Sequence, residues 1–126
     1  MIISIDWASN TKDTIVMTCH DEWHWEDFFN TWDICMRVAQ RGTTPVNIII
    51  NANPSCGLPA GTPRQLMELA KLELPSFHRV VFVRNDALIA ATVRLLQSHC
   101  AEYAERYFHT WTIEEAIELC ASKRTV

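Results

Sequence analysis

Two short segments rich in β-branched residues constrain the fold of this chain most strongly. They are Val46–Asn51 (VNIIIN) and Arg79–Arg84 (RVVFVR), and nearly every position inside them is apolar. Strands buried on both faces have this pattern, which is typical of the centre of a parallel sheet. Parallel neighbours need a crossover connection, usually a helix. The sequence therefore predicts an α/β domain.

A wide apolar stripe at helical spacing predicts the first helix. We expect His24 to be its N-cap, with Trp23 and Phe28 packed across the helix start as a hydrophobic staple. Gly42 and Pro45 predict its end. The residues of the stripe are Trp25, Phe28, Phe29, Trp32, Cys35, Met36 and Ala39.

Three further helices are expected. Thr62 is predicted to cap one of them, with Pro63 at its first helical position. Asn85-Asp86 begins a long helix that continues through Tyr103 and places His99 and Cys100 on its inner side. The capping-box pattern Thr112–Glu115 opens the last helix. Its predicted inward residues are Ile113, Ala116, Ile117 and Cys120.

Three other segments are predicted strands: Ile2–Trp7 and Thr14–Cys19, which surround a polar turn, and Tyr107–Thr110. The first two indicate an antiparallel hairpin. The expected order is β-β-α-β-α-β-α-β-α in a single domain, 1–126. Strands that alternate with helices imply a mostly parallel sheet, here with an antiparallel edge strand and helices packed on the sheet.

Composition excludes several classes of protein. The formal net charge is -4 and Lys and Arg form no basic run, which argues against a nucleic-acid partner. No apolar run approaches the roughly 18 residues of a membrane span, and we expect no signal peptide. The five cysteines include no C-x-x-C pair, which favours reduced thiols and a cytoplasmic location.

The loop 52–61 is the main candidate site, because ligands of parallel α/β sheets gather beyond the carboxyl ends of the strands. It contains two of the three glycines and two of the five prolines. The alternative is a plain connector. The loop after Asn85 is expected to open at the same edge. The candidate partner- or ligand-binding residues are Asn51, Asn53, Ser55, Cys56, Gly57, Asn85 and Asp86.

Two other hypotheses are weaker than their structural alternatives. Cys56 could be a nucleophile, but the sequence ties no base to it and it precedes the helix by several residues. His20 and His24 have the spacing of a helical metal pair, but the helix is expected to begin only at about His24, so turn and cap roles explain them better. No metal site, cofactor or catalytic residue is predicted.

Five tryptophans are many for 126 residues. Trp25 and Trp32 lie on the predicted apolar stripe and are expected to be buried. Trp7 and Trp23 could be buried, or could form a partner surface or the wall of an apolar pocket.

The element order, the chain length and the segment Trp23–Phe28 resemble the STAS (anti-sigma-factor-antagonist-like, or SpoIIAA-like) family of small α/β domains. The strands that end near Asn51 and Asn85 and the Thr112–Ala116 helix start also agree. The resemblance implies a phosphorylatable Ser or Thr in the loop after the third strand. Ser55 stands nearest to that position, with Gly57 as a partial match, but the family's Asp-Ser-Ser-Gly pattern is absent.

We therefore expect a non-enzymatic, STAS-like protein-interaction or regulatory module that binds a protein partner or a second copy through loop 52–61. The alternative is a carrier that holds a small apolar or lipid-like ligand between sheet and helices, by analogy with lipid-binding domains related in fold.

Overall fold

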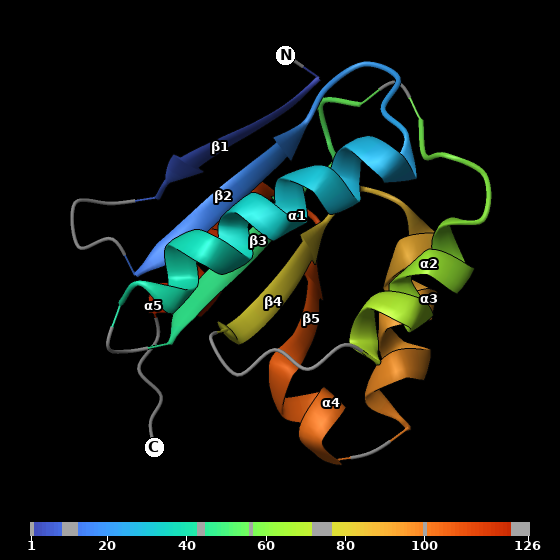
Figure 1. The fold of residues 1–126 in the computed structure, drawn as a ribbon. Coiled ribbons are helices and arrows are strands. Elements are labelled where there is room, and N and C mark those ends of the chain that lie inside the picture. Colours follow the sequence, from blue (N-terminus) through green and yellow to red (C-terminus); the bar gives the residue numbers. More distant parts are fainter. Residues whose placement is uncertain are drawn as a thin grey trace.

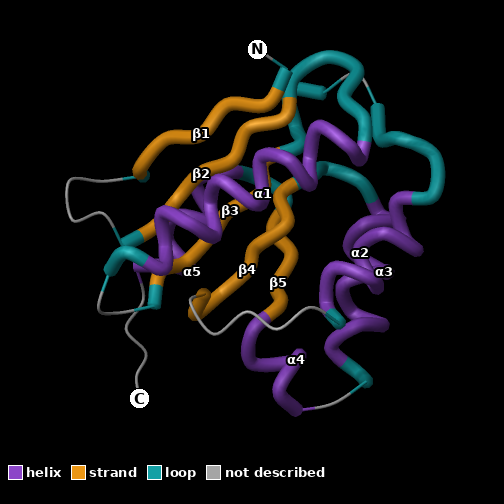
Figure 2. Tube along the Cα trace, viewed as in Figure 1, coloured by secondary structure: helices purple, strands orange, loops and turns teal. Residues whose placement is uncertain are grey.

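The computed structural model describes residues 2–8, 13–42, 45–55, 57–71, 77–99 and 101–121. These residues form one five-stranded sheet with helices on both faces (Figures 1 and 2). In chain order the elements are β1 (Ile3–Trp7), β2 (Thr14–Cys19), α1 (Trp25–Gln40), β3 (Val46–Asn51), α2 (Thr62–Ala70), β4 (Phe77–Val83), α3 (Ala87–Gln97), α4 (Ala101–Arg106), β5 (Tyr107–Thr110) and α5 (Ile113–Ala121).

The strands stand side by side in their sequence order, β1-β2-β3-β4-β5. β1 pairs with β2 in antiparallel fashion, and the other three pairs are parallel. The predicted α/β fold with one antiparallel edge strand is confirmed. Each crossover moves the chain one strand further in the same direction. Because such crossovers share one hand, their helices fall on one face of the sheet.

The sheet therefore carries two unequal apolar layers. The larger layer lies under α1, α2 and α3 and includes Ile48 and Ile50 of β3. The smaller layer lies between the opposite face and α5, and includes Ile49 and Ala116. Figure 1 shows α5 behind the sheet and α1 in front of it. Alternate residues of β3 thus enter different layers, which explains why Ile48, Ile49 and Ile50 are all apolar.

The start of α1 follows the sequence prediction. His24 is the N-cap, and its backbone N–H donates to the Asp27 carboxylate at 3.1 Å. The ring centroids of Trp23 and Phe28 lie 6.0 Å apart across the helix start, as a hydrophobic staple requires. Phe28, Trp32, Cys35 and Ala39 are buried, so the predicted apolar stripe faces the core, but Trp25, which was also expected to be buried, is only partly so.

The prediction of one long helix from Asp86 through Tyr103 is wrong, because the structure has two shorter helices there. α3 ends at Gln97 and α4 begins at Ala101. Ser98 Oγ donates to the carbonyl of Leu95 at 2.6 Å, and His99 Nδ1 lies 3.0 Å from the same oxygen. These side chains compete with the backbone for helical hydrogen bonds. His99 is exposed rather than inward, and Cys100 lies outside the described residues.

Two smaller predictions are also wrong. The N-cap of α2 is Gly61, with φ 80°, and Thr62 is the first helical residue. The Thr62 hydroxyl donates instead to the carbonyl of Pro59 at 2.6 Å. In α5, Ile117 is 41% exposed, whereas Leu119 packs toward the sheet. Ile117 is one residue past Ala116, about 100° around the helix, and therefore lies on the flank of the buried stripe.

Candidate functional site

The carboxyl ends of the parallel strands meet at one edge of the sheet, where α1, α2 and α3 begin. The loops after β3, β4 and β5 lie along this edge. Their exposed residues Asn53, Pro54, Asn85 and Trp111 are called the strand-end surface below. In open α/β sheets such an edge is where ligands bind.

The Asn53 side chain ties these three loops together. Its Nδ2 donates to the backbone carbonyl of Trp111 at 3.0 Å. Its Oδ1 accepts the backbone N–H of Asn85 at 2.8 Å. The Asn51 side chain in turn accepts the N–H of Asn53 at 3.2 Å. The expectation that the loops after Asn51 and Asn85 open side by side is therefore confirmed, and β5 contributes a third loop.

Ser55 lies below this surface and is only 7% exposed. Its hydroxyl donates to the carbonyl of Ala52 at 2.7 Å. Nη1 of Arg84 donates to the Ala52 carbonyl at 2.5 Å and to the Ser55 carbonyl and hydroxyl at 3.1 and 2.8 Å. Ser55 also forms an isolated parallel bridge with Asp21, which has a positive φ of 51°. The loop after β3 is thus attached to its neighbours on both sides.

The other predicted site residues have simpler surroundings. Asp86 is the N-cap of α3, and its side chain accepts the N–H of Leu88 at 2.8 Å. Gly57 is exposed, and Cys56 lies outside the described residues. His20 lies in the turn before α1, with Nε2 3.4 Å from Ser4 Oγ. Within the described ranges, no three His, Cys, Asp or Glu side chains are grouped to hold a metal ion.

The cysteines at 19, 35 and 120 are free thiols. Burial raises the pKa of Cys19 and Cys35 from 9.0 to about 12, and that of Cys120 to about 11. A thiol with a raised pKa holds its proton near neutral pH and is a poor nucleophile. These three side chains are therefore packing groups.

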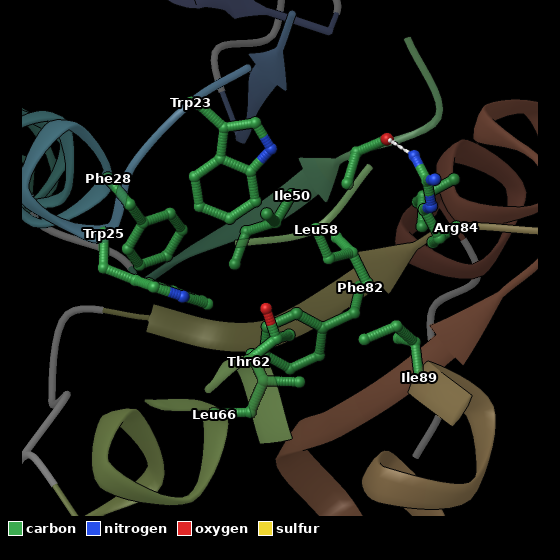
Figure 3. A pocket seen from close by; sticks show the side chains of 12 residues that line it. Trp23, Trp25, Phe28, Ile50, Leu58, Thr62, Leu66, Phe82, Arg84 and Ile89 are labelled. Carbon is green, nitrogen blue, oxygen red and sulfur yellow. Dashed lines mark hydrogen bonds between the residues drawn. The ribbon is translucent and has the colours of Figure 1, made fainter. Parts of the chain in front are cut away.

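A small apolar pocket lies just inside the strand-end edge, between the sheet and the first turns of α1, α2 and α3 (Figure 3). The enclosed cavity measures about 20 Å³, which is room for about one water. Its lining residues are Trp23, Trp25, Phe28, Ile50, Ala52, Leu58, Thr62, Leu66, Phe82, Val83, Arg84 and Ile89.

The two tryptophans of this pocket carry buried indole N–H groups without partners. Trp23 is 4% exposed, and neither its Nε1 nor that of Trp25 has a hydrogen bond. Their rings meet edge to face with centroids 5.0 Å apart. Buried donors are rarely left unpaired in native proteins, and each exception calls for an explanation.

Arg84 and Trp111 were not among the predicted site residues. Trp111 is 44% exposed, and its ring lies 4.6 Å from that of His109 and perpendicular to it. Nε2 of His109 is 2.9 Å from the carbonyl oxygen of Arg84. A charged residue that directly follows a buried strand was a usable signal for Arg84. The sequence carries no comparable signal for Trp111.

No protein-family model, curated protein or solved structure matches this chain in sequence or fold comparisons. Among the helices in the described part of the chain, none has the length and apolarity needed to cross a membrane.

Proposed function

We propose that this chain is a STAS-like, non-enzymatic interaction module that binds a protein partner through the strand-end surface. The observation that carries the proposal is the pair of hydrogen bonds from Asn53 to the loops of Asn85 and Trp111. These bonds fix the backbone of the loop that carries Trp111, whose side chain is 44% exposed. Tryptophans are enriched among the residues that dominate binding energy at protein interfaces, and a rigid platform lowers the ordering cost.

Regulation at Ser55, which the STAS resemblance implies, forms part of this proposal. The hydroxyl is buried and bonded to the Ala52 carbonyl, so a kinase requires the loop to open first. A phosphate on this oxygen would break that bond and place negative charge beside Arg84. Because Arg84 also contacts Ala52, the modification would change how the loop after β3 is attached.

Affinity purification from extracts of the source organism tests the proposal, with wild-type, Trp111→Ala and Ile34→Ala baits compared quantitatively. Ile34 is a matched control because it is 48% exposed and lies on α1. The proposal predicts partners that Trp111→Ala loses at least tenfold and Ile34→Ala retains. Equal recovery with both variants would place the binding surface elsewhere.

A second candidate function is the carriage of a small apolar ligand, and the pocket behind the strand-end edge favours it. Four of the residues that line this pocket are aromatic: Trp23, Trp25, Phe28 and Phe82. Small-molecule sites are concave, mostly apolar and equipped with a few polar groups. The enclosed cavity of about 20 Å³ is much smaller than most ligand sites, roughly 300–1,000 Å³, so carriage of a ligand requires this pocket to widen.

A further inference from the structure

We propose that the pocket behind the strand-end edge binds a small apolar carboxylic acid, whose carboxylate accepts hydrogen bonds from the indole groups of Trp23 and Trp25 and is stabilised by the positive charge of Arg84 across the pocket. This inference rests on the second candidate function and names the chemistry of its ligand. It depends on three features of the pocket: unpaired donors, an unneutralised cation and the absence of acidic side chains.

The unpaired donors are the first feature. Trp23 Nε1 and Trp25 Nε1 are buried on adjacent rings without an acceptor. Figure 3 shows both rings, with Phe28, on the side of the pocket opposite Arg84. The one hydroxyl in the lining, that of Thr62, already donates to Pro59. Neither this hydroxyl nor any other group in the described part of the chain accepts from the two indole N–H groups, and a ligand oxygen would supply that acceptor.

The cation is the second feature. Within the described ranges, the hydrogen bonds of the Arg84 side chain run from Nη1 to oxygens of Ala52 and Ser55. Its Nε and Nη2 form none with the described residues, and no described carboxylate pairs with Arg84. A guanidinium has five donors in a planar fork that suits a carboxylate. Backbone oxygens orient this group but do not neutralise its charge.

The electrostatics of the lining are the third feature. None of the twelve lining residues is acidic. The first turn of α2, which contributes Thr62, contains no acidic side chain either, whereas Glu26 and Asp27 of the first turn of α1 lie outside the lining. A helix N-terminus carries a partial positive charge, so this turn adds to the field of Arg84. The net preference of the pocket is for an anionic head.

The walls determine the rest of the ligand. Ile50, Leu66, Ile89 and Phe82 offer only apolar contacts, so the body of the acid is apolar. The enclosed space is about 20 Å³, which is room for little more than one water. Entry of a ligand therefore requires a wall to move. Trp25 and Leu58 are the partly exposed apolar wall residues, so they are the ones placed to move outward.

Nuclear magnetic resonance of the indole N–H signals tests this inference with hexanoate and 1-hexanol as probes. The two probes share a chain length and differ in the charge of the head group. The full chain has five tryptophans, and Trp→Phe variants assign their signals. Hexanoate is expected to shift the Trp23 and Trp25 signals saturably, with at least tenfold higher affinity than hexanol, because hydrogen bonds to charged groups are the strong ones.

Variants separate binding from folding. Trp25→Phe keeps an aromatic wall and removes only the donor, and it should weaken hexanoate about tenfold and hexanol much less, because hydrogen bonds to charged acceptors are the stronger ones. Arg84→Met should weaken hexanoate at least as much, whereas Arg94→Met, at an exposed position on α3, should not. Trp25→Phe keeps the inference falsifiable if Arg84→Met fails to fold.

Three outcomes would overturn the inference. Equal affinity for hexanoate and hexanol would contradict the preference for a carboxylic acid but would agree with the carriage of an apolar ligand. No saturable shift with either probe at millimolar concentrations would contradict both the carboxylic-acid ligand and the carrier function. An ordered water would then be the partner of the indole groups. Unchanged hexanoate affinity in both Trp25→Phe and Arg84→Met would place the acid at another site.

Discussion

One nitrogen of the Arg84 guanidinium lies 2.8 Å from the hydroxyl oxygen of Ser55 and 3.1 Å from its carbonyl oxygen. This contact joins the loop after β3 to the end of β4. It adds an attachment to the two that Asn53 makes with the loops of Trp111 and Asn85. Both proposed functions depend on this attachment, because the strand-end surface and the apolar pocket share the same loop.

Ser55→Ala should destabilise the protein. The substitution removes the hydroxyl that Arg84 and Ala52 both contact in a buried setting, at an expected cost of about 1–3 kcal/mol in the free energy of unfolding. Urea denaturation measures the change. Ser98→Ala is the control, because its hydroxyl bonds Leu95 at an exposed site. Equal effects of the two substitutions would show that the Ser55 contacts contribute little.

Variants of Asn53 should distinguish the contribution of its hydrogen bond to Asn85 from that of its hydrogen bond to Trp111. Asn53→Asp keeps an acceptor for the Asn85 N–H and loses the donor to Trp111, whereas Asn53→Ala loses both. We expect Asn53→Ala to be the less stable variant, by about 0.5–1.5 kcal/mol. Amide hydrogen exchange should quicken at Asn85 in Asn53→Ala only. Quickened exchange at Asn85 in both variants would contradict the assigned bond.

The two described glycines of the loop should respond differently to alanine. Gly61 has a φ of 80°, where a side chain is strained, although nothing lies within 4 Å of its Cβ position. Gly61→Ala should therefore cost about 1 kcal/mol through backbone strain alone. Gly57→Ala, which also enters open space, should be close to neutral. Thermal unfolding of both variants checks the difference, and equal midpoints would argue against the N-cap conformation.

Stability should fall in alkaline solution. Burial raises the pKa of Cys19 and Cys35 from 9.0 to about 12, so the unfolded chain releases these protons before the folded chain does. Their stabilising contribution is complete below pH 9 and is lost as pH rises from 9 toward 12. Each thiol contributes about 1.4 kcal/mol per pH unit in this window.

Urea denaturation at about pH 8 and pH 10 measures this loss, which should total about 3 kcal/mol for the two thiols. Cys19→Ala is the matched variant and should lose about half of that pH dependence, whatever its effect on stability at neutral pH. An unchanged pH dependence in Cys19→Ala would mean that the thiol is not shielded from ionisation.

Local patterns predicted most of the fold. The strands Val46–Asn51, Thr14–Cys19 and Tyr107–Thr110 have the bounds that the sequence predicted. The start of α1 was equally readable, because a cap, an acidic first turn and a staple all agree there. The break after Gln97 was not readable, since the apolar spacing continues through Tyr103 and neither Gly nor Pro marks the end. Hydrogen bonds of Ser98 and His99 replace that signal.

The site was predicted only in part. The shared strand edge predicted that the loops of Asn51 and Asn85 would meet, because parallel strands end on the same side. Trp111 joins them only because β5 stands beside β4, and sequence spacing does not define strand order. The unpaired indole groups of Trp23 and Trp25 depend on which acceptors the folded chain brings near them. A sequence pattern contains no such information.

Hydrogen–deuterium exchange of the chain, free and bound to a partner that Trp111→Ala fails to retain, locates the binding surface. Binding through the strand-end surface should slow exchange in residues 53–55, 84–88 and 109–112, the three loops that Asn53 joins. Protection confined to β1 and the exposed face of α1, with no change in those loops, would contradict it.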